Sequence, residues 1–237
     1  AHELRTPLSN IRGYLEAVQD GLVQPTPEVI ASLHEEAMLL NRLVNDLQEL
    51  AVAEAGQLRL ARQPVAIGEL IERAVQIVQG RVNGSRTIST AVAANLPLLN
   101  VDAERIGQVL RNLLNNSVEY TPPGGKILIG ARQLNGQIQV NVYNEGAGIP
   151  AEHLPNVFER FYRVDDSRAR ATGGSGLGLA IVKQLVEAHG GRVWAESIAG
   201  QYANFVFVLP IDEAGKVAHK STRPAPPLEH STQFQVE

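Results

Sequence analysis

The chain has 237 residues, 44% of them hydrophobic, a net charge of −4 and an isoelectric point near 5.9. An acidic chain argues against a nucleic-acid partner, and the absence of cysteine excludes disulfides and thiolate metal sites. No apolar run approaches the roughly 20 residues that a membrane helix needs, and no signal-peptide pattern is present.

Residues 1 to about 22 are predicted to form a helix, because apolar residues recur in alternating steps of four and three. This seam consists of Leu4, Leu8, Ile11, Leu15, Val18 and Leu22. His2 lies one residue off the seam and is followed by Glu3, with Arg5 and Thr6 on its own face. We expect His2 to be accessible to water and to a partner; a solvated helix residue without a reaction is the alternative.

A second helix is predicted from about 27 to 54, with Thr26 as its N-cap and Pro27 at its first position. Its seam consists of Ile30, Leu33, Ala37, Leu40, Val44, Leu47 and Ala51. Two such helices form an antiparallel hairpin with too small a core of its own. Pairing with a second copy into a four-helix bundle is one solution, and packing on the downstream domain is the other.

The remainder reads as an α+β domain. Residues 56–66 form a boundary, helices are expected at 67–79, 102–119 and 176–189, and strands at 86–93, 98–101, 126–134, 137–143, 191–197 and 203–209. Asn135-Gly136 is a strong signal for a two-residue hairpin turn. The aperiodic stretch 144–174 is long enough to suggest a functional lid. We therefore predict a helical hairpin in residues 1–62, an α/β domain in 63–212 and a polar, proline-rich, disordered tail in 213–237.

Asn112 and Asn116 stand four residues apart and hence on one face of the helix predicted at 102–119. Amide oxygens are hard neutral ligands that suit a Mg²⁺ ion which keeps water and phosphate oxygens. Tyr120, two turns after Asn112, is placed to lie along a base. Either asparagine alone would read as a solvated helix residue.

Two glycine-rich segments follow. In the first, Asn144 precedes Gly146, Gly148 and Ile149, so a polar side chain can read a base edge while the backbone approaches a ligand. The second opens a helix, whose free N–H groups favour phosphate, and contains Gly174, Gly176, Leu177, Gly178 and Leu179. Between them, Phe158 and Arg163 bound an aromatic and basic cluster in the expected lid.

Together these segments resemble the motifs of two-component sensor histidine kinases. HELRTPL (2–8), NLLNNSVEYTPPGG (112–125), NEGAGIP (144–150), FERFYR (158–163) and GGSGLGLAI (173–181) resemble, in this order, the H, N, G1, F and G2 boxes. The likeness covers nearly everything from His2 to Pro210. It implies a hairpin forming half of a dimeric four-helix bundle, followed by a two-layer α/β sandwich of the type shared by Hsp90, gyrase B and MutL.

The resemblance also implies roles for individual residues. His2 would accept the phosphoryl group of ATP, Glu3 would orient or accept the ring proton, and Thr6 would position water for phosphatase action on a partner. Asn116 would bind Mg²⁺ with support from Asn112, and Tyr120 would neighbour the adenine. The remaining ATP-binding positions are Asn144, Gly146, Gly148, Ile149, Phe158, Arg163, Gly174, Gly176, Leu177, Gly178 and Leu179.

Three positions depart from the family pattern. Asn144 stands where most members carry Asp, and a neutral acceptor makes a weaker bond than a carboxylate, which predicts reduced ATP affinity. Glu119 occupies a place where Lys or Arg often faces phosphate. Asn204 stands just before Phe205, where Ser or Thr is frequent near the base.

The leading hypothesis is therefore an ATP- and Mg²⁺-dependent protein-histidine kinase that autophosphorylates His2 and passes the group to the receiver domain of a response regulator. A second hypothesis is a weak or inactive kinase that acts as a nucleotide-gated scaffold or phosphatase. A third, an ATPase clamp, gives no reason for His2-Glu3 on a helical hairpin. We expect this chain to be the cytoplasmic portion of a longer, membrane-anchored bacterial protein whose upstream sensor segment is absent.

Overall fold

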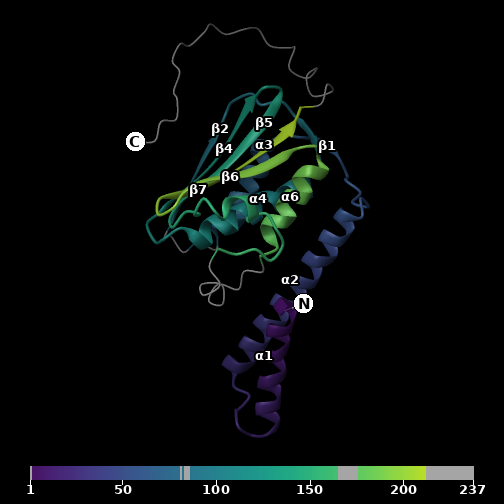
Figure 1. The fold of residues 1–237 in the computed structure, drawn as a ribbon, viewed down its shortest axis with the longest axis vertical. Coiled ribbons are helices and arrows are strands. Elements are labelled where there is room, and N and C mark those ends of the chain that lie inside the picture. Colours follow the sequence, from purple (N-terminus) through teal and green to yellow (C-terminus); the bar gives the residue numbers. More distant parts are fainter. Residues whose placement is uncertain (1, 81, 83–85, 165–175, 212–237) are drawn as a thin grey trace.

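The computed structural model of the chain describes residues 2–80, 82, 86–164 and 176–211. It consists of a long helical hairpin and an α/β domain mounted at one end of it (Figure 1). The tail after Ile211, Gly174 and the rest of the segment 165–175 lie outside the described residues, as do the side chains of His2 and Glu3.

The hairpin consists of α1 (His2–Gln19) and α2 (Pro27–Glu54). α1 ends about a turn earlier than expected. The predicted start of α2 is confirmed: the side chain of Thr26 accepts a hydrogen bond from the N–H of Val29, and Pro27 is the first helical residue. Proline is tolerated there because its missing N–H would have no helical partner.

In each predicted seam some apolar side chains are half-buried and the others are exposed to solvent. In the first seam Leu4, Ile11 and Val18, spaced by seven, are half-buried, whereas Leu8, Leu15 and Leu22, also spaced by seven, are exposed. In α2 Leu33, Leu40 and Leu47 are half-buried, whereas Ile30, Ala37, Val44 and Ala51 are exposed. One apolar stripe of each helix therefore closes the hairpin, and the other has no cover within the described chain.

The most buried residues of α2 were not part of the predicted seam. Leu43 and Leu50 are 3% and 1% exposed and belong to the core cluster that continues into the α/β domain. α2 also lies against α6 (Gly178–Ala188). The hairpin thus packs on its own downstream domain, which is one of the two predicted arrangements. Its exposed apolar stripes are still available for the other arrangement, pairing with a second copy.

The α/β domain contains a five-stranded sheet in the order β2-β4-β5-β7-β6. Its strands are β2 (Thr87–Val92), β4 (Lys126–Leu134), β5 (Gln137–Glu145), β6 (Arg192–Ile198) and β7 (Tyr202–Pro210). β2 and β4 are parallel and the other neighbours antiparallel. Two short strands, β1 (Gln63–Val65) and β3 (Leu99–Val101), pair beside the sheet; β1 was not predicted.

Three helices cover one face of the sheet: α3 (Ile67–Gln79), α4 (Ala103–Tyr120) and α6 (Figure 1). Alternate residues of β5 and β7, such as Val140, Val142, Phe205 and Phe207, point to this layer and form the core with it. This is the predicted two-layer α/β arrangement. A 3-10 turn, η1 (Leu154–Asn156), interrupts the segment that was expected to lack structure.

Strand boundaries differ from the prediction at the functional end of the sheet. β5 continues through Glu145 because β4 pairs with it as far as Asn144, at Ile127↔Asn144, and β7 as far as Glu145, at Glu145↔Tyr202. Asn144 is therefore a strand residue and not the first residue of a loop. The predicted Asn135-Gly136 turn is confirmed, with φ of +49° and +76° at the two positions. Among the helices that the structure describes, none has the length and apolarity required to cross a membrane.

Candidate functional site

The site is built around the carboxyl-terminal half of α4. The helix begins at Asp102, whose carboxylate accepts hydrogen bonds from the N–H groups of Glu104 and Arg105. Farther along, Asn112 donates from Nδ2 to the carbonyl of Gly178, 3.2 Å away, and so ties α4 to the first turn of α6. Asn116 is half-buried one turn later on the same face, and Tyr120 ends the helix with its side chain largely exposed.

Asn144 lies on the floor between α4 and the sheet. It shares the helix-facing side of β5 with Val140 and Val142, and only 2% of its surface is exposed. Its cross-strand neighbours are Ile127 and Ala203. Its Nδ2 donates to the carbonyl of Glu145 at 3.3 Å. Since only the nitrogen can donate to a carbonyl, this bond directs Oδ1 to serve as the acceptor.

Gly146 and Gly148 are required by protein backbone packed against them. A Cβ on Gly146 would stand 2.3 Å from the carbonyl oxygen of Tyr120, and one on Gly148 2.2 Å from that of Ile198. Both have positive φ, +150° and +61°. These glycines bring the loop into contact with α4 and with the β6–β7 turn. That they also admit a ligand to the backbone stays a prediction. Ile149 is fixed there by its N–H, which donates to Ser197 Oγ at 2.7 Å.

A cavity of about 610 Å³ opens at this end of α4. Tyr120, Gly146 and Glu119 line it together with Arg86, Thr121, Pro122, Ala147, Gly200 and Gln201. Arg86 donates from Nε to the carbonyl of Thr121 at 2.6 Å, which anchors the loop that follows α4. The glycine-flanked region is thus open at this edge and bounded by two of the predicted site residues, Tyr120 and Gly146.

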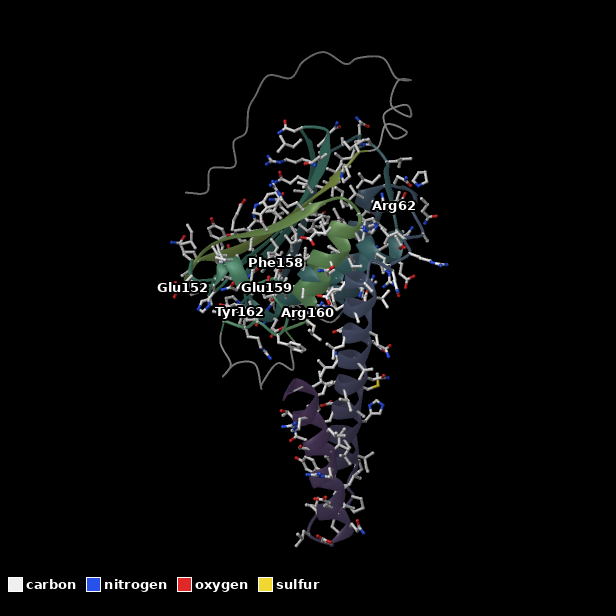
Figure 2. The ribbon with its side chains drawn as sticks, turned by 45° about the vertical axis from the view of Figure 1, so that its right-hand side comes forward. Arg62, Glu152, Phe158, Glu159, Arg160 and Tyr162 are labelled. Atoms are coloured by element: carbon white, nitrogen blue, oxygen red, sulfur yellow. The ribbon has the colours of Figure 1, made fainter. Side chains whose placement is uncertain are left out.

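The aromatic cluster is partly a core element. Phe158 is buried and meets Phe205 of β7 edge to face, with ring centroids 6.3 Å apart. Tyr162 is joined to His153 by a 2.6 Å contact between its hydroxyl and Nδ1. Glu159 pairs with Lys183 of α6 at 3.4 Å, and Arg160 pairs with Glu54 at the end of α2. Figure 2 shows Phe158, Glu159, Arg160 and Tyr162 grouped on the side of the domain that faces the hairpin.

The second glycine segment meets this cluster directly. The N–H of Phe161 donates to the carbonyl of Gly176 at 3.0 Å, and a Cβ on Gly176 would lie 2.9 Å from Cα of Phe161. Phe161 itself has φ of +60°, a rare conformation for an aromatic residue. Leu177 is buried, Gly178 begins α6 and Leu179 is half-buried. Arg163 is half-buried just beyond Phe161.

A junction that the sequence did not reveal joins the hairpin to α4. The carboxylate of Asp102 accepts from the N–H of Ala61 at 2.9 Å, and its own N–H donates to Nε2 of buried His189 at 3.0 Å. His189 Nδ1 lies 2.7 Å from the carbonyl of Leu185, so the ring is neutral with its proton on Nδ1. Burial lowers the pKa of His189. Beside this junction, Arg62 donates from Nη2 to the carbonyl of Ala188 at 3.0 Å (Figure 2).

The pKa of Asp102 reflects two opposing causes. Burial raises the pKa of this carboxyl, but the hydrogen bonds from the backbone of Ala61, Arg105 and Glu104 outweigh it, and the pKa lies below its ordinary value. The carboxylate is therefore held ionised at the start of the helix that carries the site.

A second unpredicted contact lies farther along α2. Glu49 receives Arg105 Nη1 on one carboxylate oxygen and Gln108 Nε2 on the other, both at 2.6 Å. Burial, and then the charge of Glu49, raise the pKa of neighbouring Asp46. Together with Leu43 and Leu50, this pairing attaches α2 to the first two turns of α4.

The predicted phosphoacceptor group lies on α1, apart from these elements. His2 and Glu3 are in the first turn of the helix, and Thr6 is exposed one turn on. The amino end of α1 lies beside α2 where the hairpin meets the α/β domain (Figure 1). The role of these three residues stays a prediction.

One of the three departures from the family pattern does not bear on the site. Asn204 points to the face of the sheet away from the helices, where its Nδ2 donates to Glu196 at 3.2 Å. The β7 residue in register with Asn144 is Ala203. The expectation that Asn204 lies near a base was wrong, because neighbouring residues of a strand face opposite sides. Glu119, in contrast, lines the cavity.

The donor set fits a Mg²⁺ ion that is bound chiefly by a nucleotide. No group of three or more acidic, histidine or cysteine side chains that could hold a metal occurs in the described part of the chain. Asn116 offers a single neutral oxygen donor. Mg²⁺ keeps several waters and phosphate oxygens in such sites, so one amide ligand suffices only when phosphates supply the rest.

Two known families match separate parts of the chain. Residues 1–56 match the family described as His Kinase A (phospho-acceptor) domain. Residues 101–213 match the family described as Histidine kinase-, DNA gyrase B-, and HSP90-like ATPase.

Among curated proteins, the chain is 41% identical over 217 residues to the signal transduction histidine-protein kinase BaeS of Escherichia coli. It is 36% identical over 222 residues to the sensor histidine kinase WalK of Bacillus subtilis. Each match covers 90% of this chain but only 45% and 36% of the relative, so the chain spans less than half of these proteins.

Three solved structures share the fold. The histidine kinase AdeS of Acinetobacter baumannii is 26% identical with a TM-score of 0.77, over 90% of this chain and 99% of that one. ShkA in complex with AMPPNP is 32% identical with a TM-score of 0.68, over 88% and 44%. ThkA in complex with the response regulator protein TrrA is 24% identical with a TM-score of 0.72, over 90% and 60%, and shows the fold alone.

Proposed function

The chain belongs to the two-component sensor histidine kinases, and we propose that it transfers the γ-phosphoryl group of ATP to His2 and from there to an aspartate of a response-regulator receiver domain. The phospho-acceptor and ATPase-type domains both fall within this chain. We propose both transfer steps, from ATP to His2 and from His2 to the receiver aspartate.

The observation that carries the proposal is that two distant segments, the start of α6 and the end of β5 with its loop, meet the second half of α4. Asn112 is bonded to Gly178, Tyr120 packs against Gly146, and Asn144 lies on the floor beneath them. The cavity opens beside the contact between Tyr120 and Gly146. This arrangement holds the amide of Asn112 at the amino end of α6, and the amino end of a helix suits the phosphates of a nucleotide. The AMPPNP complex of the related ShkA supports a nucleotide here.

Different residues of this chain would bind the base, the Mg²⁺ ion and the phosphates. Asn144 would accept from the base, Tyr120 and Ile149 would cover its faces, and Asn116 would hold the Mg²⁺ ion that neutralises phosphate charge when it is bound. The free N–H groups at the start of α6 would face the phosphates. Gly174 and Arg163 remain predicted contacts from the family pattern.

His2 would act as the nucleophile. The neutral imidazole nitrogen forms the N–P bond as the bond between the γ-phosphorus and the bridging oxygen breaks, and ADP leaves with that electron pair. Glu3 would accept a hydrogen bond from the other ring N–H, which keeps the attacking nitrogen unprotonated. In the second step the phosphoryl group passes to a carboxylate oxygen of the receiver aspartate, and His2 is regenerated. The solved complex of ThkA with the response regulator protein TrrA supports a partner of this kind.

The open stripes of the hairpin support a homodimer. Leu8, Leu15 and Leu22 along the first seam, with Ile30 and Val44 on α2, repeat every seven residues or a multiple of seven and are exposed. An apolar heptad stripe of this kind is covered in a four-helix bundle by a second copy. Leu15→Glu should abolish concentration-dependent sedimentation of the chain, whereas Ser9→Glu, on the exposed surface of the same helix, should leave it intact. Leu15→Glu protein that sediments as the wild type does would contradict the dimer.

Two further parts of the proposal concern phosphatase activity and the longer protein. Thr6, exposed on the same face as His2, would orient water for hydrolysis of the partner's phospho-aspartate. We propose that this chain is the cytoplasmic portion of a sensor anchored in the bacterial membrane through a segment outside it.

Labelling tests the central step. Incubation with [γ-³²P]ATP and Mg²⁺ should give a label that is lost in acid and stable in base, and that is absent from His2→Gln. His34→Gln is the matched control, since His34 is a histidine of α2 in the same hairpin. Label that persists in His2→Gln would disprove the assignment of the phosphoacceptor.

A weak kinase that serves as a nucleotide-gated scaffold or phosphatase is the second candidate. It is favoured by the carboxylate of Glu119 in the cavity wall and by the neutral amide at Asn144. Titration with ATP separates the two: binding below millimolar concentration supports the kinase, and no binding at millimolar nucleotide supports the scaffold.

A further inference from the structure

The inner face of α4 contains one polar side chain whose hydroxyl has no partner. Its buried stripe runs through Ile106, Val109, Leu110, Leu113 and Leu114 to Ser117. Ser117 is fully buried, and its Oγ forms no hydrogen bond within the described part of the chain. Its carbonyl, by contrast, accepts from both the N–H and the hydroxyl of Thr121, at 3.0 and 2.6 Å.

The other buried polar side chains on the helix side are satisfied. Asp102 accepts three backbone N–H groups, His189 is bonded at both ring nitrogens, and Thr121 donates to Ser117. A buried hydroxyl without a partner lowers stability, and alanine would fill the position with a better helix former. The hydroxyl of Ser117 is therefore explained best by a partner that arrives with a ligand.

Ser117 and Asn144 occupy the same level of the site. Gly146 lies against the carbonyl of Tyr120, so the end of β5 is held beside the end of α4. Ser117 lies one helical turn before Thr121, at the end of α4, and Asn144 lies two residues before Gly146. Each residue is therefore about 5–7 Å back along its own element from the place where α4 and Gly146 meet. Ser117 faces the sheet, and Asn144 faces the helices. The hydroxyl of Ser117 on α4 and the amide of Asn144 on β5 thus face each other between the helix and the sheet.

We propose that Ser117 reads the nucleobase together with Asn144, as a specificity residue of the site assigned under the proposed function. The edge of adenine carries an amino donor at C6 next to an acceptor at N1. Asn144 Oδ1 accepts from the amino group, and the hydroxyl of Ser117 donates to N1. The two groups therefore match the adenine edge in order and in polarity.

The bond between Asn144 and Glu145 adds discrimination against 6-oxo purines. Hypoxanthine presents an acceptor at C6 and a donor at N1, which reverses the pattern. Asn144 could meet that acceptor only with its amide nitrogen, but the bond from Nδ2 to the carbonyl of Glu145 holds the amide with Oδ1 toward the base. The carbonyl of hypoxanthine then faces the oxygen of Asn144, and unpaired acceptors are costly in a buried site.

The test compares ADP with 1-deaza-ADP, which lacks only the N1 acceptor, by calorimetric titration of the full chain. Wild-type protein should bind ADP about three- to tenfold more tightly than 1-deaza-ADP, the range expected for one neutral hydrogen bond. Ser117→Ala should lose this preference by weakening ADP alone, and its binding of 1-deaza-ADP should stay within about twofold of wild type. IDP should bind more weakly than either to the wild type.

Two further measurements exclude a merely structural effect. Ser117→Ala should unfold at a higher temperature than the wild type without nucleotide, since it removes an unpartnered buried hydroxyl, yet bind ADP less tightly. Asn204→Ala is the matched control, because Asn204 Oδ1 is the other buried unpartnered oxygen of the described residues and lies on the opposite face of the sheet. It should keep the full preference for ADP.

The outcomes separate this proposal from the one it rests on. Wild-type protein that binds neither nucleotide would contradict nucleotide binding itself, and this proposal with it. Wild-type protein that prefers ADP, combined with a Ser117→Ala variant that keeps the same preference, would overturn the role of Ser117 alone.

Discussion

Leu50 tests whether α2 is docked on the α/β domain in solution. Its side chain is 1% exposed, belongs to the common core cluster and lies on α2, the helix that packs against α6. Truncation of a buried leucine to alanine costs about 2–5 kcal/mol, from lost burial and from the cavity left behind. Because this cavity lies between two bodies that can close on it, we expect Leu50→Ala to lose about 2–3 kcal/mol.

Val52→Ala is the matched control. Val52 lies two residues farther along the same helix and is 42% exposed, so its truncation should change the free energy of unfolding by less than about 0.5 kcal/mol. Both variants are compared with the wild type in urea, with helix content followed by circular dichroism at one protein concentration, since a dimer makes stability depend on concentration. If Leu50→Ala costs no more than Val52→Ala, α2 moves free of the domain and the docked arrangement is refuted.

Three further predictions concern the site and its junction. Gly148→Ala should destabilise the chain by more than about 2 kcal/mol, because its Cβ would meet the carbonyl of Ile198 at 2.2 Å and φ is +61°, whereas Gly136→Ala, with φ of +76° and open space, should cost about 1 kcal/mol in thermal unfolding. The lowered pKa of His189 means that the unfolded chain takes up a proton there that the folded chain refuses, so stability should fall as the pH drops below about 6.5, the ordinary value of the unfolded side chain. That part of the pH slope should vanish in His189→Gln; an unchanged slope would show that the ring is protonated within the fold. Asp102 acts in a lower window: its lowered pKa adds stability above its ordinary value of 3.8, and this is lost as the pH falls through the folded pKa.

Periodicity predicted the elements well, but not which partner each apolar face meets. The alternation of three and four along α1 and α2 was sufficient to place both helices and their seams. It could not tell Leu4, which is covered within the hairpin, from Leu15, which is exposed, because both fit the same stripe. Leu43 and Leu50 fell outside the seam altogether, since a helix that contacts two neighbours needs a wider apolar arc than a two-stranded pattern describes.

The strand residues show a similar limit. The end of β5 was placed at Tyr143 because the next residues are polar and glycine-rich, yet pairing with β4 and β7 extends it to Asn144 and to Glu145, respectively. Neighbouring residues of a strand face opposite sides, so the position of Asn204 beside Phe205 in the sequence did not tell which side of the sheet it faces. Burial on the helix side of β5, known only from the sheet, is what places Asn144 on the floor of the site.

Long-range polar contacts left no trace that the sequence could show. His189 is a single histidine at the end of a helix, and Glu49 is one of many acidic residues on α2. Their partners, Asp102 and Arg105, are 87 and 56 residues away. No local spacing rule connects residues so far apart, so the junction between hairpin and domain could be found only in three dimensions.

The short connection after α2 has a mechanical consequence. Ala61 and Arg62 follow the end of α2 by seven and eight residues, and they are bonded to Asp102 at the start of α4 and to Ala188 at the end of α6, respectively. Because Glu49 also holds α2 directly to Arg105 and Gln108 of α4, a rotation of α2 must either break these bonds or turn α4 with it. A rotation of the hairpin would then be passed to α4, the helix that carries the proposed nucleotide-binding residues Asn112 and Asn116.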